Sequence, residues 1–359
     1  MAPARFPVWH GRSRAAWRQE GRHNMVKFAS ELLQIPGPEN VYPDVLQRGL
    51  LLEELGFDIG MVGQHRFVQG NPSAVFTLLA AVAARTDRIM LGPGILVLPA
   101  YHPLDVAEGI ATLDQISNGR AFLGVGSGYR ELELQATGLE PADRGSLTRE
   151  ALEVLNTVWD NELASYHGKH FSFEGVSVAP RTVQDRPLII VGTKGKIGSR
   201  RAGRLADGII GGLVQSIDEY RPAIDYYTEA AANAGRKSRL WLQRSVCIAR
   251  NRDELETEWL PGFLENRRGK LALGPGLAAS AVDFAILEGR TPSLEEAANG
   301  YALVGTADEV IQQIKELQES VDVDTLVVNH HWSTGDNARI ERQLRLFADE
   351  VMPAFRRAQ

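Results

Sequence analysis

The feature that most constrains the fold of this chain is a regular alternation of short apolar runs with longer segments of helical periodicity. A run that is apolar at every position is typical of a strand buried on both faces, as in a parallel sheet covered by helices. The alternation begins after Met25 and continues almost to the C-terminus. The runs predict eight strands, at residues 26–33, 57–62, 89–98, 121–125, 188–191, 208–210, 240–249 and 325–329.

Eight strand-helix units predict an α/β fold of the (β/α)8 TIM-barrel type with insertions, because a doubly wound open sheet usually has about five or six strands. A barrel needs about 250 residues before loops are added, so a chain of 359 residues has room for insertions. They are expected at about 161–186, as a hairpin, and at about 269–301, as an Ala/Gly-rich lid or crossover loop. Residues 25–359 are expected to form this one barrel domain, and residues 1–24 a poorly ordered N-terminal extension.

Composition argues against several classes of protein. A net charge of −6 is unlike the basic surface of a nucleic-acid-binding protein. No stretch after the N-terminal segment approaches the ~18 uninterrupted apolar residues of a membrane-spanning helix. A single cysteine, Cys247, allows no intrachain disulfide and no multi-cysteine metal site, and it suits a cytoplasmic protein. The sequence has neither a Gly-x-Ser-x-Gly elbow nor a His-Glu-x-x-His zinc motif, and we predict no metal site.

In such a barrel the chemistry lies in the loops that follow the strands. The loop after the second predicted strand contains His65 between Gln64 and Arg66. An imidazole at this place could act as a catalytic acid or base or donate to a cofactor ring, and a structural histidine is the alternative. The Gly-rich loop after the fourth strand lacks the third glycine of a dinucleotide fingerprint. In that loop Tyr129 and Arg130 are therefore better site candidates than the glycines.

The loop after the fifth predicted strand runs directly into a helix and reads Gly-Thr-Lys-Gly-Lys-Ile-Gly-Ser over residues 192–199. Free N–H groups at a helix N-terminus, with lysines nearby, suit a phosphate group. The loop lacks the Lys-Ser/Thr pair of a Walker A motif, and a solvated Gly-rich loop is the alternative. The predicted cofactor-binding residues here are Gly192, Thr193, Lys194, Gly195 and Lys196.

Histidines follow two other strands. His102, after the third, is expected to brace its loop rather than to take part in chemistry. After the eighth strand come His330, His331 and Trp332. Neighbouring residues of an extended chain point to opposite sides, so the two histidines are not expected to share a metal. We expect one of them to reach a substrate pocket, and we predict His330 and Trp332 as its residues.

Several further motifs occur in a definite order along the chain. The most specific is Leu-Asp-Gln-Ile-Ser-Asn-Gly-Arg at 113–120, followed by alternating glycines at 124–128. Leu-Pro-x-x-His-Pro at 98–103 precedes it, and Ala-Asp-Gly at 206–208 and Glu-Val-Met-Pro at 350–353 follow it. In this order the motifs resemble the bacterial luciferase-like monooxygenase family, from about Met25 to Phe355.

The resemblance implies a reduced flavin mononucleotide (FMN) across the barrel mouth and molecular oxygen as co-substrate. The chain would then be an oxidoreductase of the flavin-dependent monooxygenase type, acting on a small organic substrate. A separate flavin reductase would commonly supply the reduced flavin, and a homodimer is expected. By residue match, His65 would lie near the flavin ring, while Arg144 and the 192–199 loop would hold the phosphate. Ser127 stands where the luciferases have a phosphate-binding arginine.

The sequence also departs from the family pattern. Gln64 and Arg66 replace a glutamate and a histidine, and Gly126 replaces the cysteine of the luciferases, so light emission is not implied. One branch of the family uses the deazaflavin coenzyme F-420, which transfers hydride and reacts poorly with oxygen. An F-420-dependent oxidoreductase is therefore the alternative. A barrel enzyme acting on a sugar phosphate would need a catalytic pair that we do not find, and a non-catalytic flavin-binding subunit would not need to retain His65 and Arg144.

Overall fold

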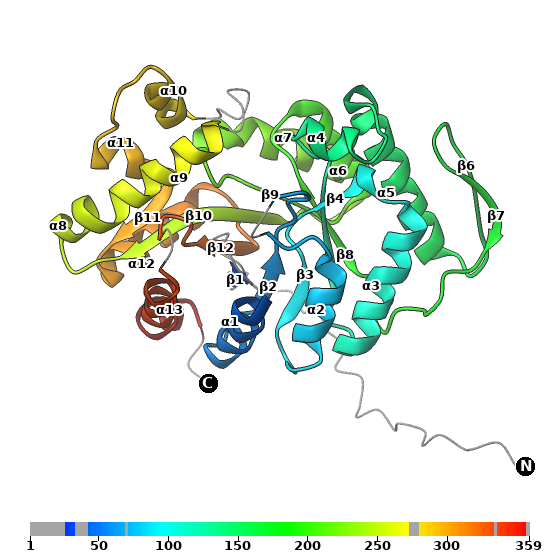
Figure 1. The fold of residues 1–359 in the computed structure, drawn as a ribbon, viewed down its shortest axis with the longest axis horizontal. Coiled ribbons are helices and arrows are strands. Elements are labelled where there is room, and N and C mark those ends of the chain that lie inside the picture. The colour runs from blue at the N-terminus through cyan, green and yellow to red at the C-terminus, as the bar shows by residue number, and fades with distance from the viewer. Residues whose placement is uncertain (1–25, 33–41, 69–70, 273–279, 334–335, 357–359) are drawn as a thin grey trace, which may run out of the picture.

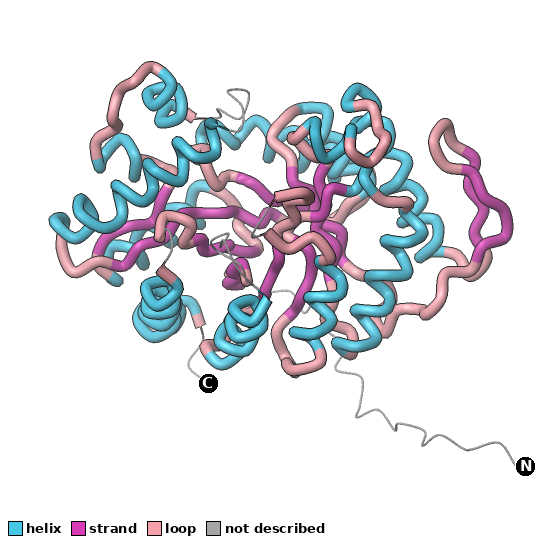
Figure 2. Tube along the Cα trace, viewed as in Figure 1, coloured by secondary structure: helices cyan, strands magenta, loops and turns pink. Residues whose placement is uncertain are grey.

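The structure is a computed structural model that describes residues 26–32, 42–68, 71–272, 280–333 and 336–356. Parallel strands lie at the centre of the molecule, and helices surround them (Figures 1 and 2). The extension expected at residues 1–24 lies outside the described residues. Within the described segments, no helix has both the length and the apolar character needed to cross a membrane.

The central strands form a parallel barrel with eight wall positions, which confirms the predicted fold class. One of these positions is shared by two short strands separated at Gly94 and Ile95. The barrel strands are β1 (Lys27–Glu31), β2 (Ile59–Val62), β3 (Met90–Pro93), β4 (Leu96–Val97), β5 (Phe122–Gly126), β8 (Leu188–Gly192), β9 (Gly208–Gly211), β10 (Leu240–Ile248) and β12 (Thr325–Asn329). They follow the order β3-β2-β1-β12-β10-β9-β8-β5-β4. A bridge from Leu91 to Ala121 brings the two ends of this sheet together.

Helices cover the outside of the barrel, and their ends follow local capping rules. Asn118 ends α3 in the left-handed conformation, with φ of 55°. The His102 side chain accepts the N–H of Leu104 at the start of that helix, so the expected bracing role of His102 is confirmed. The principal outer helices are α1 (Tyr42–Glu54), α2 (Val75–Ala83), α3 (Pro103–Ser117), α5 (Arg144–Asp160), α6 (Lys196–Leu205), α7 (Ile217–Asn233), α12 (Ala307–Ser320) and α13 (Asn337–Leu346), and a short helix, α4 (Glu131–Gln135), follows β5.

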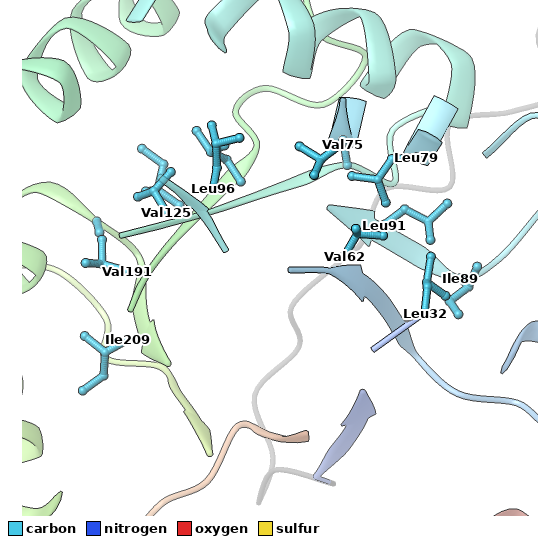
Figure 3. Close-up of a cluster of buried hydrophobic side chains, with 14 of the residues drawn as sticks. Leu32, Val62, Val75, Leu79, Ile89, Leu91, Leu96, Val125, Val191 and Ile209 are labelled. Carbon is cyan, nitrogen blue, oxygen red and sulfur yellow. The ribbon is translucent and has the colours of Figure 1, made fainter. Parts of the chain in front are cut away.

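Alternate residues of each strand fill two separate apolar layers. Ile210 packs inside the barrel with Phe122 and Trp241, whereas its neighbour Ile209 faces the helices. Figure 3 shows part of the outer layer, where Val75 and Leu79 of α2 lie near side chains of the wall strands. Because both faces of the strands are covered, the strand sequences are apolar at consecutive positions rather than alternately.

The motif at 113–120 has a structural role at the end of the barrel where the strands begin. Arg120 is only 9% exposed, yet it has no carboxylate partner among the described residues. Its guanidinium instead donates to the carbonyls of Ala83, Thr86, Ile89 and Ser117 and to the Thr86 hydroxyl, at 2.6–3.2 Å. These bonds hold the turn between α2 and β3 against the end of α3.

Two insertions depart from the minimal barrel. The expected hairpin is confirmed, because β6 (Ala164–His167) and β7 (Ser172–Val176) pair in antiparallel fashion and project from the barrel (Figure 1). The 269–301 segment is largely helical where the structure describes it, rather than a loop. The second insertion also begins earlier than the predicted residue 269. It contains α8 (Arg252–Glu254), a π-helical turn (Leu255–Trp259), α9 (Leu260–Ala272), α10 (Ala281–Leu287) and α11 (Leu294–Ala298). It ends in β11 (Ala302–Gly305), which we did not predict and which pairs with β10.

The buried Arg120 generates a stability prediction. Arg120→Met should lower the free energy of unfolding by roughly 3–5 kcal/mol, because the acceptors around it are left buried and unpaired. Urea denaturation followed by circular dichroism measures this. Arg221→Met, on the half-exposed face of α7, is the matched control and should change stability by less than about 0.5 kcal/mol. Equal stability of the two variants would contradict the structural role of Arg120.

Candidate active site

A cluster of titratable side chains lies at the carboxyl ends of the barrel strands. Glu31 ends β1 and Asn329 ends β12, its neighbour in the sheet. His65 follows β2, which pairs with β1 on the other side, and His331 lies two residues beyond β12. Since all these strands are parallel, their carboxyl ends open at one mouth, which is where barrel enzymes place their chemistry.

The centre of this cluster is a close contact between the Glu31 carboxylate and the His331 imidazole. The His331 Nε2 atom lies 3.1 Å from Glu31 Oε2. Asn329 contacts both partners, with its Nδ2 atom 3.4 Å from Glu31 Oε1 and 3.2 Å from His331 Nε2. Burial alone would raise the pKa of the Glu31 carboxyl, but the charges of His331, Lys270 and His65 more than offset this and lower it. Glu31 is therefore an anion at neutral pH.

His65 belongs to the same electrostatic group. Burial lowers the pKa of its imidazole below 6.5, and nearby Lys270 and Arg130 add to this, while Glu31 opposes it. The imidazole is therefore largely neutral at pH 7 and can accept a proton. The Tyr129 ring lies edge-on to the His65 ring, with centroids 6.2 Å apart. The structure thus brings together two residues that we singled out separately.

Helix α9 of the second insertion lies over one side of this mouth. Lys270 of α9 borders a small cavity of about 20 Å³ together with His331, Asn329 and Trp332. Burial lowers the pKa of Lys270 to about 8. Trp332 is held in place by its indole N–H, which donates to the Val246 carbonyl at 2.7 Å. A cation and an apolar wall therefore border the Glu31–His331 pair.

Our choice of His330 as the pocket residue needs correction. His330 is fully buried, and its pKa is lowered to about 3 by burial, by Arg48 and by His331. It does not border the cavity at the mouth, whereas His331 does. Adjacent residues after β12 point to different sides, so only one of the two histidines could reach the mouth.

The predicted phosphate loop lies next to the β5 loop. Gly126 and Gly192 are register partners at the ends of β5 and β8, so the loops that follow them, with Ser127 and Thr193, leave the barrel at neighbouring positions. The Ser127 Oγ atom lies 3.0 Å from Thr148 Oγ1, and that hydroxyl donates to the Arg144 carbonyl at 2.6 Å. The first turn of α5, the 192–196 loop and Ser127 therefore converge.

The start of α6 suits an anion by its backbone. The helix begins at Lys196 with Gly195 as its N-cap, and no side chain caps it. One turn inside, the Ser199 hydroxyl is buried without a hydrogen-bond partner. The Lys196 amine lies over the Tyr226 ring of α7, at 5.2 Å, so it does not point into the loop in this structure. Free N–H groups and an unpaired hydroxyl fit a phosphate. Arg201 of α6, which sequence analysis missed, lies beside Gly145 near the start of α5.

Comparison with known proteins agrees with this geometry. A family model described as luciferase-like monooxygenase matches residues 24–323. The chain belongs to the luciferase-like monooxygenase family. This confirms the resemblance drawn from its motifs and makes the chain an oxidoreductase.

Relatives in the luciferase-like family include two kinds of enzyme. The chain is 28% identical over 320 residues to 4-hydroxyprotoasukamycin monooxygenase of Streptomyces nodosus subsp. asukaensis, covering 85% of this chain and 84% of the relative. It is 26% identical over 328 residues to the F420-dependent glucose-6-phosphate dehydrogenase of Amycolatopsis mediterranei, covering 87% and 94%. The crystal structure of monooxygenase RslO1 from Streptomyces bottropensis matches with a TM-score of 0.77 at 27% identity, covering 92% and 100%.

Sequence analysis missed three residues of the mouth: Glu31, His331 and Lys270. Glu31 is the one acid at the end of the first apolar run, and this was the available signal for it. Lys270 had no comparable signal, because its position at the mouth depends on how α9 packs.

The charges at the mouth generate a pH prediction. The His65 imidazole should titrate below 6.5, and Glu31→Gln should lower its pKa further, because the mutation removes the negative charge that favours the imidazolium. NMR titration of the histidine ring signals measures this without any assay of turnover. Glu140→Gln, an exposed substitution, is the control and should leave the titration unchanged. An upward shift of the His65 pKa in Glu31→Gln would contradict the arrangement.

Proposed function

We propose that this protein is a flavin-dependent monooxygenase that uses reduced FMN and O2 to oxygenate a small organic substrate. The observation that carries the proposal is the β5 loop, which joins the two halves of the site. Ser127 in this loop adjoins the predicted phosphate loop, and Tyr129, two residues on, contacts His65 at the mouth. A ligand with a phosphate at one end and a flat ring at the other has this shape.

The residues present suit such a cofactor. The N–H groups of the 192–196 loop, the Ser127 hydroxyl and the Arg144 guanidinium would hold the phosphate, with the helix N-terminus adding its dipole. Reduced flavin would supply the reaction with oxygen, while the protein orients it and keeps water away.

The residues at the barrel mouth would transfer protons during the reaction. Neutral His65 can take a proton from the substrate or cofactor, and Tyr129, whose pKa is raised mainly by burial, stays protonated as a donor. Glu31 would hold the His331 imidazole in place through the 3.1 Å contact with its Nε2 atom. Lys270 and Trp332 border the adjoining cavity and would contact the substrate. A separate flavin reductase, a homodimeric state and a cytoplasmic location are part of this proposal.

The alternative is an F-420-dependent oxidoreductase that transfers hydride. The relative from Amycolatopsis mediterranei favours it, since the match covers 94% of that enzyme. Lys194 and Lys196 at the phosphate loop could serve the tail of either coenzyme.

Anaerobic titration with each reduced cofactor, followed by mixing with aerated buffer, separates the two functions. Our proposal expects reduced FMN to bind more tightly than reduced F-420 and to be reoxidised by O2 in the presence of an acceptor substrate. Binding of F-420 alone, with no reaction with oxygen, would establish the alternative. Binding of neither would refute both.

Removing the predicted phosphate contact should weaken cofactor binding. Arg144→Ala is expected to raise the Kd for reduced FMN by roughly tenfold or more, the usual effect of losing a charge-assisted hydrogen bond. Anaerobic fluorescence titration measures the Kd. Arg221→Ala, also exposed on an outer helix, should bind as the wild type does. An unchanged Kd in Arg144→Ala would remove this residue from the site.

Removing His65 should affect turnover rather than affinity. His65→Ala is expected to lower kcat by about 100-fold or more, as the loss of a general acid-base group does, with a change of less than about threefold in the FMN Kd. Steady-state kinetics with the same titration measures both. Equal losses in kcat and affinity would instead make His65 a binding or folding residue.

A further inference from the structure

A sizeable cavity lies outside the barrel mouth, on the outer side of the barrel. Its volume is about 720 Å³, within the range of small-molecule sites. It lies between α7, the end of the second insertion, β11 and α12, and most of its lining is apolar. It is lined by residues that include Arg244, Asn299, Leu303 and Leu317, with Glu295, Glu296 and Glu316 at its edge.

Arg244 of β10 is the buried charge of this cavity. The alternation of β10 fixes its direction, because Trp241 packs inside the barrel while Leu240, Leu242 and Val246 join the outer layer. Arg244 therefore points outward, away from the barrel mouth and the site described above. Only 2% of this residue is exposed.

The guanidinium of Arg244 is incompletely paired. Its Nη1 atom donates to the carbonyls of Gly212 and Gln243. Its Nη2 atom is buried and has no hydrogen-bond partner. Among the described ion pairs, none includes Arg244, and its pKa of about 10 keeps it charged at neutral pH. A buried cation without a partner anion is strongly unfavourable, whereas Arg267 of α9 is buried with Asp283 at 2.6 Å.

We propose that this cavity is a second ligand site, for a small organic carboxylate with an apolar body whose carboxylate pairs with Arg244. The apolar lining from Leu303 and Leu317 suits the body of such a ligand. A phosphate dianion fits less well, because one arginine would have to balance two charges next to the edge glutamates. A neutral ligand could accept a hydrogen bond from Nη2, but it would leave the buried positive charge of Arg244 without an anion.

The edge glutamates do not supply the missing anion. Glu295 pairs with Arg252, and Glu296 pairs with Arg290 and accepts the N–H of Ser293. Glu316 accepts from Gln312 on its own helix, and no contact joins any of the three to Arg244. They would instead repel a second negative charge on the ligand, which favours a monoanion.

Binding of sodium hexanoate, measured by saturation-transfer NMR on the full chain, tests this site without any cofactor. Hexanoate should bind the wild type, and 1-hexanol and hexyl phosphate should bind at least about tenfold more weakly, because only the carboxylate makes the charge-assisted bond without excess charge. Failure of hexanoate to bind, or equal binding of hexanoate and hexanol, would overturn the proposal.

Two variants test whether hexanoate binds in this cavity. Arg244→Gln, which keeps a donor for the Gly212 carbonyl, should weaken hexanoate at least about tenfold, while Arg345→Gln on α13, which does not line this cavity, should not change it. If Arg244→Gln does not fold, Asn299→Trp tests the location of the ligand instead. Asn299 is exposed at the edge of the cavity, so an indole at this position would block the cavity while leaving Arg244 intact. Unchanged hexanoate binding in either folded variant would overturn the assignment, since it would place the ligand elsewhere, such as at the barrel mouth.

Discussion

The pairing of β1 with β12 is the contact on which the rest of this structure depends. Ser30 and Val328 are register partners although they are 298 residues apart, so the ring can close only when the two ends of the barrel sequence meet. The same pairing creates the chemistry of the mouth, because the two residues that end these strands, Glu31 and Asn329, then lie side by side. Glu31 and His331 therefore come together only when β1 pairs with β12 and closes the barrel.

The barrel mouth and the Arg244 cavity differ in how their buried charges are compensated. At the mouth, the buried anion of Glu31 lies close to Lys270 and to the His331 imidazole, so its charge has partners within the protein. Arg244 has no such compensation, and its remaining bonds go only to backbone carbonyls. A balanced group can hold and move protons, whereas an unbalanced cation favours the binding of an anion.

The second insertion supplies part of the mouth through its own packing. Trp259 and Phe263 stack at 4.9 Å, and they belong with Trp332 to an apolar cluster separate from the barrel core. Gly262 of α9 lies against the Trp332 backbone so closely that a Cβ atom there would collide with the Trp332 carbonyl. This contact sets where α9 runs, and so where Lys270 meets the mouth.

The sequence by itself determined the barrel, because strands buried on both faces must be apolar at consecutive positions, and that pattern is local. It also determined the bracing by His102, the hairpin and, through ordered motifs, the family. It did not reveal β11, whose short run becomes a strand only by pairing with β10. It selected His330 where the structure places His331 at the mouth, and it did not show that Glu31 and Lys270 reach the mouth. Those outcomes depend on strand register and helix packing between residues up to 300 positions apart, so only the tertiary structure decided them.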